Sequence, residues 1–76
     1  MQPAWDQEWD AGEIGCGELV LLLRKRLLDL TPGKVLRLHA LDGGAPEDIP
    51  SWCRIMGHAL VHSQPPYYFI QRKLED

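Results

Sequence analysis

The sequence predicts an α+β fold, a two-layer βαβαββ sandwich with two helices on one face of a mixed four-stranded sheet. Two segments carry apolar residues at helical spacing, and four others form short runs typical of strands. Glycine and proline separate the segments. A chain of 76 residues has room for one compact core, and this arrangement lets both helices bury their apolar sides against the sheet.

The first helix is expected over residues 18–30. Its apolar side holds Leu19, Val20, Leu23, Leu27 and Leu30, which follow helical spacing. Arg24, Lys25, Arg26 and Asp29 share the opposite side. Thr31, Pro32 and Gly33 then end the helix and turn the chain.

A second, shorter helix is expected from residue 46 or 47 to residue 56. Pro50 fits there only if it lies in the first turn, where its missing N–H has no partner to lose. Gly57 is suited to end the helix in a left-handed conformation. The apolar stripe of this helix consists of Ile49, Trp52, Cys53 and Met56.

Strands are expected over residues 35–41, 59–63 and 67–72. In the first of these, Leu36, Leu38 and Ala40 alternate with Arg37 and His39, which predicts one buried and one wet side. A short first strand is expected around residues 5–9. We therefore expect a single domain over residues 1–76, in which residues 1–9 form an irregular N-terminal extension or an edge strand.

Composition narrows the classes of function. The net charge of −3 argues against direct binding of nucleic acid, and the apolar run over residues 19–23 is too short to span a membrane. Two cysteines without a signal peptide indicate a reducing compartment, so we expect a cytoplasmic protein. The three histidines share no ligand face, and no cofactor motif is present, so neither a metal nor a cofactor is expected.

Cys16 lies between Gly15 and Gly17 at the start of the first helix. Amides at a helix N-terminus lack intrahelical partners and favour an anion such as a thiolate or a persulfide. Glu18, in the same turn, opposes part of this effect. The stretch predicts an accessible, mildly activated thiol, although a cysteine that simply packs the start of the helix is the alternative.

Several motifs resemble those of the TusA/SirA-like sulfur carriers over residues 10–73. The Asp-Ile-Pro-Ser-Trp-Cys run at residues 48–53, with Met56 and His58 after it, is similar to the signature of that family's second helix. Arg24 and Lys25, the run at residues 31–38, and the run at residues 65–73 also stand where the family has them. The resemblance implies a βαβαββ fold and a carrier cysteine that accepts sulfur as a persulfide, which is Cys16 here.

The sequence departs from the family at this cysteine. The family motif is Cys-Pro-x-Pro, whereas here Cys16 is followed by Gly17, Glu18 and Leu19. If Gly17 is the first helical residue, proline at this position would stiffen the start of the helix. The leading hypothesis is a sulfur carrier that serves tRNA thiolation, cofactor assembly or sulfur metabolism. The alternative is a non-catalytic adaptor or regulatory domain that retains the fold.

The resemblance also implies partners. A carrier of this kind acts as a sulfurtransferase together with a donor enzyme, such as a cysteine desulfurase or a rhodanese-like protein, and passes sulfur to an acceptor protein. We expect a monomer whose catalytic residue is Cys16 and whose partner-binding residues are Gly15, Gly17, Glu18, Arg24 and Lys25. Cys53 is predicted to be a core thiol, and the sequence leaves a disulfide between Cys16 and Cys53 open.

Overall fold

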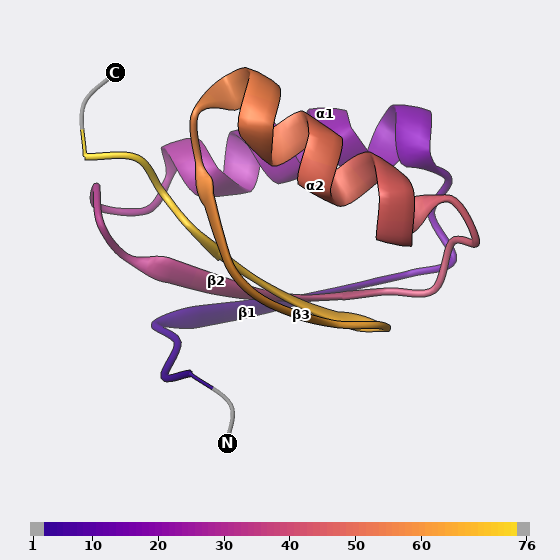
Figure 1. Cartoon of the computed structure of the whole chain (residues 1–76), viewed down its shortest axis with the longest axis horizontal. Coiled ribbons are helices and arrows are strands. Elements are labelled where there is room, and N and C mark those ends of the chain that lie inside the picture. The colour runs from indigo at the N-terminus through magenta and orange to yellow at the C-terminus, as the bar shows by residue number, and fades with distance from the viewer. Residues whose placement is uncertain (1–2, 75–76) are drawn as a thin grey trace.

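A computed structural model gives the architecture of the chain and describes residues 3–74, apart from the side chain of Cys16. The elements follow the expected order: β1 (Gln7–Gly12), α1 (Cys16–Leu28), β2 (Val35–Ala40), α2 (Ala45–Met56), β3 (Ala59–Gln64) and β4 (Tyr67–Gln71). Figure 1 shows both helices on one side of the sheet. The predicted α+β, two-layer βαβαββ fold is therefore confirmed.

The sheet is mixed, with the strand order β1-β2-β4-β3. Strands β1 and β2 are parallel because helix α1 connects them. The hairpin of β3 and β4 inserts β4 between β2 and β3, so β4 is antiparallel to both neighbours. Strands β1 and β3 form the two edges of the sheet.

The core lies between the sheet and the helices. From α1 it takes Leu19, Leu23 and Leu27, and from β2 it takes Leu36, Leu38 and Ala40, all buried. The alternation in β2 is confirmed, because Arg37 and His39 lie on the half-exposed side. In α2 the predicted stripe is confirmed in part: Ile49 and Cys53 are buried, whereas Trp52 and Met56 are half-buried.

Two elements differ from the expectation by more than one residue at both ends. The first strand is Gln7–Gly12 rather than residues 5–9. The contact with β2 begins only at Asp6, whose amide donates a hydrogen bond to the carbonyl of Val35. Helix α1 begins and ends two residues earlier than predicted. Leu30 nevertheless reaches the core from the turn that follows, where its amide binds the carbonyl of Leu27 at 3.1 Å.

The expectation for Pro50 was wrong. Helix α2 begins at Ala45, so Pro50 lies inside the helix, in its second turn. Pro46, at the second helical position, is the proline that lies in the first turn of α2. Gly57 ends the helix with φ of 82°, as predicted.

The two helices end on cationic side chains that follow β4. Arg72 Nη1 donates hydrogen bonds to the carbonyls of Leu28, at 3.0 Å, and of Leu30, at the end of α1. Lys73 Nζ donates to the carbonyl of Met56, at the end of α2, at 3.2 Å. Two consecutive residues thus donate hydrogen bonds to carbonyls at the ends of both helices. Within residues 3–74, neither helix is long and apolar enough to cross a membrane.

Candidate functional site

The N-termini of both helices lie at one end of the molecule. Strands β1 and β2 are parallel, so their carboxyl ends meet at this end, and α1 and α2 begin there (Figure 1). The amide of Leu41 binds the carbonyl of Gly12 at 2.8 Å, which ties the two strand ends together. The turn at Pro65 and Pro66 lies at the same end of the sheet, where the carbonyl of Pro66 accepts a hydrogen bond from the amide of Ala40.

Helix α1 begins at Cys16, with Gly15 as its N-cap. The amide of Leu19 is the first to find an intrahelical acceptor, the carbonyl of Gly15, at 2.8 Å. The amides of residues 16–18 precede it and have no acceptor within the helix. Gly17 is consequently the second helical residue, so the condition that it be the first is not met.

Nothing in the fold demands glycine on either side of Cys16. Gly15 and Gly17 are exposed, and a Cβ atom added to either would meet no described atom within 4 Å beyond the adjacent residues and the backbone of the helix itself. Neither has a positive φ, so a residue with a side chain would adopt the same backbone. The two glycines leave open space beside the backbone of Cys16, which a partner protein can approach closely.

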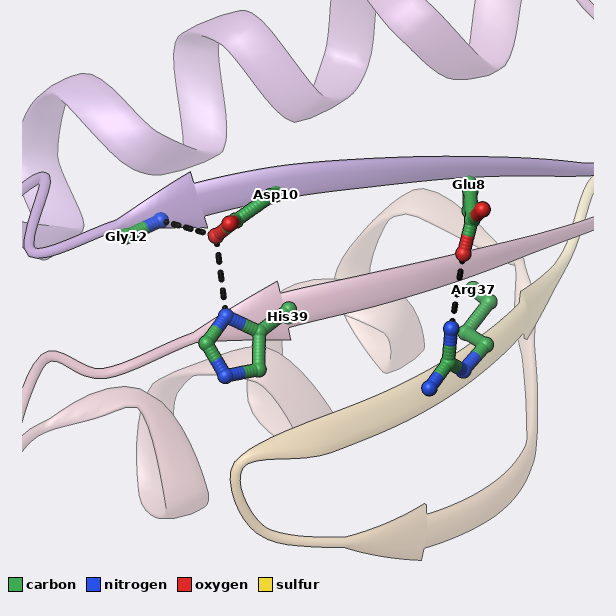
Figure 2. A network of polar contacts seen from close by, with 5 residues as sticks. All are labelled: Glu8, Asp10, Gly12, Arg37 and His39. Carbon is green, nitrogen blue, oxygen red and sulfur yellow. Dashed lines mark hydrogen bonds and ion pairs between the residues drawn. The ribbon is translucent and has the colours of Figure 1, made fainter.

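Asp10 shapes the connection that leads to Cys16. Its Oδ1 accepts the amide of Gly12 at 2.9 Å and lies 2.8 Å from Nδ1 of His39 (Figure 2). Gly12 has a φ of 57°, a left-handed conformation that favours glycine, and a bulge precedes it in the pairing of β1 with β2. These contacts turn the chain out of the sheet layer toward α1.

The hydrogen bond with His39 and the amide of Gly12 hold the pKa of Asp10 below its ordinary value. Asp42 has a similar local role at the end of β2, because its Oδ2 accepts the amide of Gly44 at 3.0 Å. Both aspartates therefore stabilise turns.

The two cysteines have different environments. Cys53 is buried in α2 as a free thiol, and burial raises its pKa to about 11. Cys53 is thus a core residue, as predicted, and is protonated at neutral pH. The expectation of an accessible Cys16 thiol falls on a side chain outside the described residues, while the backbone position of Cys16 is described.

The exposed side of α1 runs away from Cys16. Arg24 and Lys25 are exposed on it, as predicted, whereas the guanidinium of Arg26 lies 4.6 Å from the centre of the Trp9 ring. Leu21 and Leu28 are 69% and 49% exposed, and their exposure was not predicted from the sequence. Their spacing of seven residues, out of step with the buried leucines, is the signal that could have revealed them.

Within residues 3–74, and without the Cys16 side chain, no three His, Cys, Asp or Glu residues gather in a way that could hold a metal ion. The three histidines have other contacts. His39 binds Asp10, His62 packs against Phe69 with ring centres 5.5 Å apart, and Nδ1 of His58 accepts the amide of Lys73.

Comparisons with known proteins agree with this architecture. The profile of the family described as Sulfurtransferase TusA matches residues 8–72. The chain is similar to the sulfur carrier protein TusA of Pseudomonas paraeruginosa (strain PA7), at 36% identity over 70 residues, which covers 87% of this chain and 89% of the relative. The proteins of the same name from Pseudomonas aeruginosa strains LESB58 and UCBPP-PA14 match with the same identity and coverage.

Proposed function

Since the chain belongs to the TusA sulfurtransferase family of sulfur carriers, we propose that Cys16 is the thiol that carries the sulfur, as a persulfide. The observation that carries this proposal is the position of Cys16 as the first residue of α1, between two exposed glycines. The only other cysteine of the sequence, Cys53, is buried with a raised pKa.

The chemistry is thiol exchange between proteins. The Cys16 thiolate attacks the terminal sulfur of a persulfide on the donor, the sulfur–sulfur bond of the donor breaks, and the donor cysteine leaves as a thiolate. Cys16 then holds one additional sulfur. A thiolate of the acceptor protein attacks that terminal sulfur, which releases the Cys16 thiolate. Electrons balance at each step without an external oxidant or reductant.

The N-terminus of α1 favours both anionic forms of Cys16. An exposed helix terminus stabilises an anion by about 0.3–1 kcal/mol, which lowers a pKa by less than about one unit. Glu18, the acidic residue of the first turn, reduces this effect. The field therefore raises the thiolate fraction modestly, and access by the partner matters more than activation.

The partners are a sulfur donor, such as a cysteine desulfurase or a rhodanese-like protein, and an acceptor protein. We assign their contacts to Gly15, Gly17 and Glu18 at the start of α1, and to Arg24 and Lys25 farther along its exposed side. Leu21 and Leu28 extend this surface with exposed apolar area. A partner with an acidic rim around an apolar centre complements it, because such charges steer association.

The destination of the sulfur is tRNA thiolation, cofactor assembly or sulfur metabolism. A persulfide carrier needs free thiols, so we assign the protein to the cytoplasm, a reducing compartment. We further propose that it acts as a monomer, since Cys16 and the surface along α1 belong to one chain.

Loading with sulfur tests this function. The protein is incubated with a cysteine desulfurase and cysteine, and its intact mass is measured. Wild type and Cys53→Ala should gain the mass of one sulfur atom, whereas Cys16→Ser should not. If wild type remains unmodified with both a desulfurase and a rhodanese-like donor, the chain acts as an adaptor that has kept the family fold, and the carrier proposal is wrong.

A further inference from the structure

The face of the sheet that points away from the helices carries an ion pair and a carboxylate–imidazole hydrogen bond side by side. Glu8 and Asp10 on β1 stand opposite Arg37 and His39 on β2 in the parallel register. Glu8 Oε2 lies 2.7 Å from Arg37 Nη1, and Asp10 Oδ1 lies 2.8 Å from His39 Nδ1. Figure 2 shows both pairs crossing between the same two strands. The face thus has two acidic positions along one strand and two basic positions along the next.

Aromatic rings hold the basic side chains in place. The guanidinium carbon of Arg37 lies 4.3 Å from the centre of the Tyr67 ring and 4.8 Å from that of Trp5. The imidazole of His39 also contacts Tyr67, with ring centres 4.9 Å apart. A guanidinium between two rings gains cation–π stabilisation and loses freedom, so this half of the face is fixed before any ligand arrives.

These four polar side chains line an open cavity of about 370 Å³. This volume is sufficient for a small organic molecule. Its position is on the sheet face, apart from the start of α1 where Cys16 lies. The cavity is lined by Glu8, Trp9, Asp10, Arg37, His39 and Tyr67.

Each charged group keeps a second polar atom for a ligand. The two pairs use one oxygen of each carboxylate, which leaves Glu8 Oε1 and Asp10 Oδ2 outside the pairs. On the other side, Arg37 pairs through Nη1 and His39 through Nδ1, which leaves Arg37 Nη2 and His39 Nε2 outside them. Acceptors on β1 and donors on β2 therefore face one space.

The arrangement of charge selects the ligand. A simple anion would gain contacts with Arg37 and His39 but would lie beside two carboxylates. A simple cation would gain the carboxylates but would lie beside the guanidinium. A molecule with both charges can place its cationic end toward β1 and its anionic end toward β2 without disrupting either pair. The neighbouring strands are about 4.8 Å apart, a separation that one small zwitterion can bridge.

We propose that this cavity binds a small zwitterion, and specifically a free α-amino acid. Its ammonium group contacts Glu8 and Asp10, its carboxylate contacts Arg37 and His39, and its side chain lies against the Tyr67 ring. This site is separate from the sulfur-carrying function and does not depend on it.

Three ligands that share one side chain test the proposal. The ¹⁵N-labelled wild-type protein is titrated with L-leucine, with N-acetyl-L-leucine, which retains only the negative charge, and with L-leucine methyl ester. At a pH of about 6.5 the amine of the ester is protonated, so this ligand carries only the positive charge. L-Leucine should bind with a dissociation constant of about 1 mM and shift the amides of the cavity residues. The two singly charged ligands should bind at least about tenfold more weakly.

Two double variants assign the halves of the site. Arg37→Gln with His39→Gln, and Glu8→Gln with Asp10→Asn, should each weaken L-leucine binding by about tenfold or more. Arg54→Gln, at an exposed position of α2, should leave it unchanged. Equal binding of either singly charged ligand overturns the proposal, and so does the absence of shifts in wild type at about ten times the expected dissociation constant. Because the ligand comparison uses wild type, this result stands even if a double variant fails to fold.

Discussion

The carbonyl oxygen of Gly15 accepts the amide of Leu19 at 2.8 Å, and this bond makes Cys16 the first residue of helix α1. Residue 16 therefore stands where amides without intrahelical acceptors favour an anion. The neighbouring glycines are exposed and have open space around them. A thiol at this position combines a favourable field with a backbone that a partner can approach.

The position of Gly17 leads to a prediction for Gly17→Pro. Proline at the second helical position removes no hydrogen bond, but it disfavours the helical conformation of the preceding residue, Cys16. The helix should then begin one residue later, and the amide of Leu19 should exchange faster with solvent. The gain of about 0.4–1 kcal/mol from a restricted unfolded chain should offset this loss, so the free energy of unfolding should change by less than about 1 kcal/mol.

Urea unfolding and amide exchange measure both effects, with Gly17→Ala as the control that leaves Cys16 unrestricted. The alanine variant should retain the protection of the Leu19 amide. A loss of more than about 2 kcal/mol in Gly17→Pro would mean that Gly17 holds a conformation that proline cannot adopt, in contradiction to the described start of the helix.

Arg72 is expected to be a major stabilising residue although it lies outside every helix and strand. Its guanidinium binds two carbonyls at the end of α1 and is buried. Arg72→Met should lower the free energy of unfolding by about 2–3 kcal/mol, because the variant loses charged hydrogen bonds and leaves these carbonyls without them. Thermal and urea unfolding provide the measurement.

Arg54→Met is the matched control, since Arg54 is exposed on α2. It should change stability by no more than about 0.5 kcal/mol. Equal effects of the two substitutions would show that the cap formed by Arg72 does not stabilise the fold.

Asp10 should make stability depend on pH. The hydrogen bonds with His39 and with the amide of Gly12 lower the pKa of Asp10 in the folded protein below its ordinary value of 3.8. The unfolded chain therefore binds the proton more readily, so ionised Asp10 stabilises the fold above about pH 4 and loses this contribution as the pH falls through the lowered pKa.

Asp10→Asn tests this dependence, because asparagine keeps an oxygen that can accept the amide of Gly12. The variant should be less stable than wild type at neutral pH, and the difference should shrink as the pH falls below about 4. Urea unfolding between about pH 3 and pH 7 follows it, with the exposed Glu13→Gln as control. A difference that is the same at every pH would contradict the assigned role of the carboxylate.

The order of the elements and the buried face of β2 could be predicted from the sequence, because alternation and helical spacing are local properties. The partnership of Asp10 with His39 could not, since the residues are 29 positions apart and meet only when β1 and β2 pair in one register. The burial of Phe69 could not be predicted from the sequence either. Phe69 lies on the face away from the helices, opposite Arg37, yet Trp5 and His62 pack against it and it is fully buried.

At the candidate site, the position of Cys16 at the start of a helix was predictable from the glycines and the leucine run that follows. The start was displaced by two residues because glycine lowers helix propensity but does not prevent helical geometry at the first turn, where few hydrogen bonds are at stake. The exposure of Leu21 and Leu28 was not predicted, because in a run so rich in leucine the sequence does not distinguish the buried leucines from the exposed ones.

The most direct test of Cys16 as the reactive thiol is alkylation of the native protein with iodoacetamide at neutral pH, followed by peptide mapping. Cys53, with a pKa of about 11, is a thiolate in only about one molecule in ten thousand at pH 7, and burial shields it further. Cys16 should be labelled rapidly, and Cys53 should be labelled only after denaturation. Equal labelling of the two cysteines, or preferential labelling of Cys53, would contradict it.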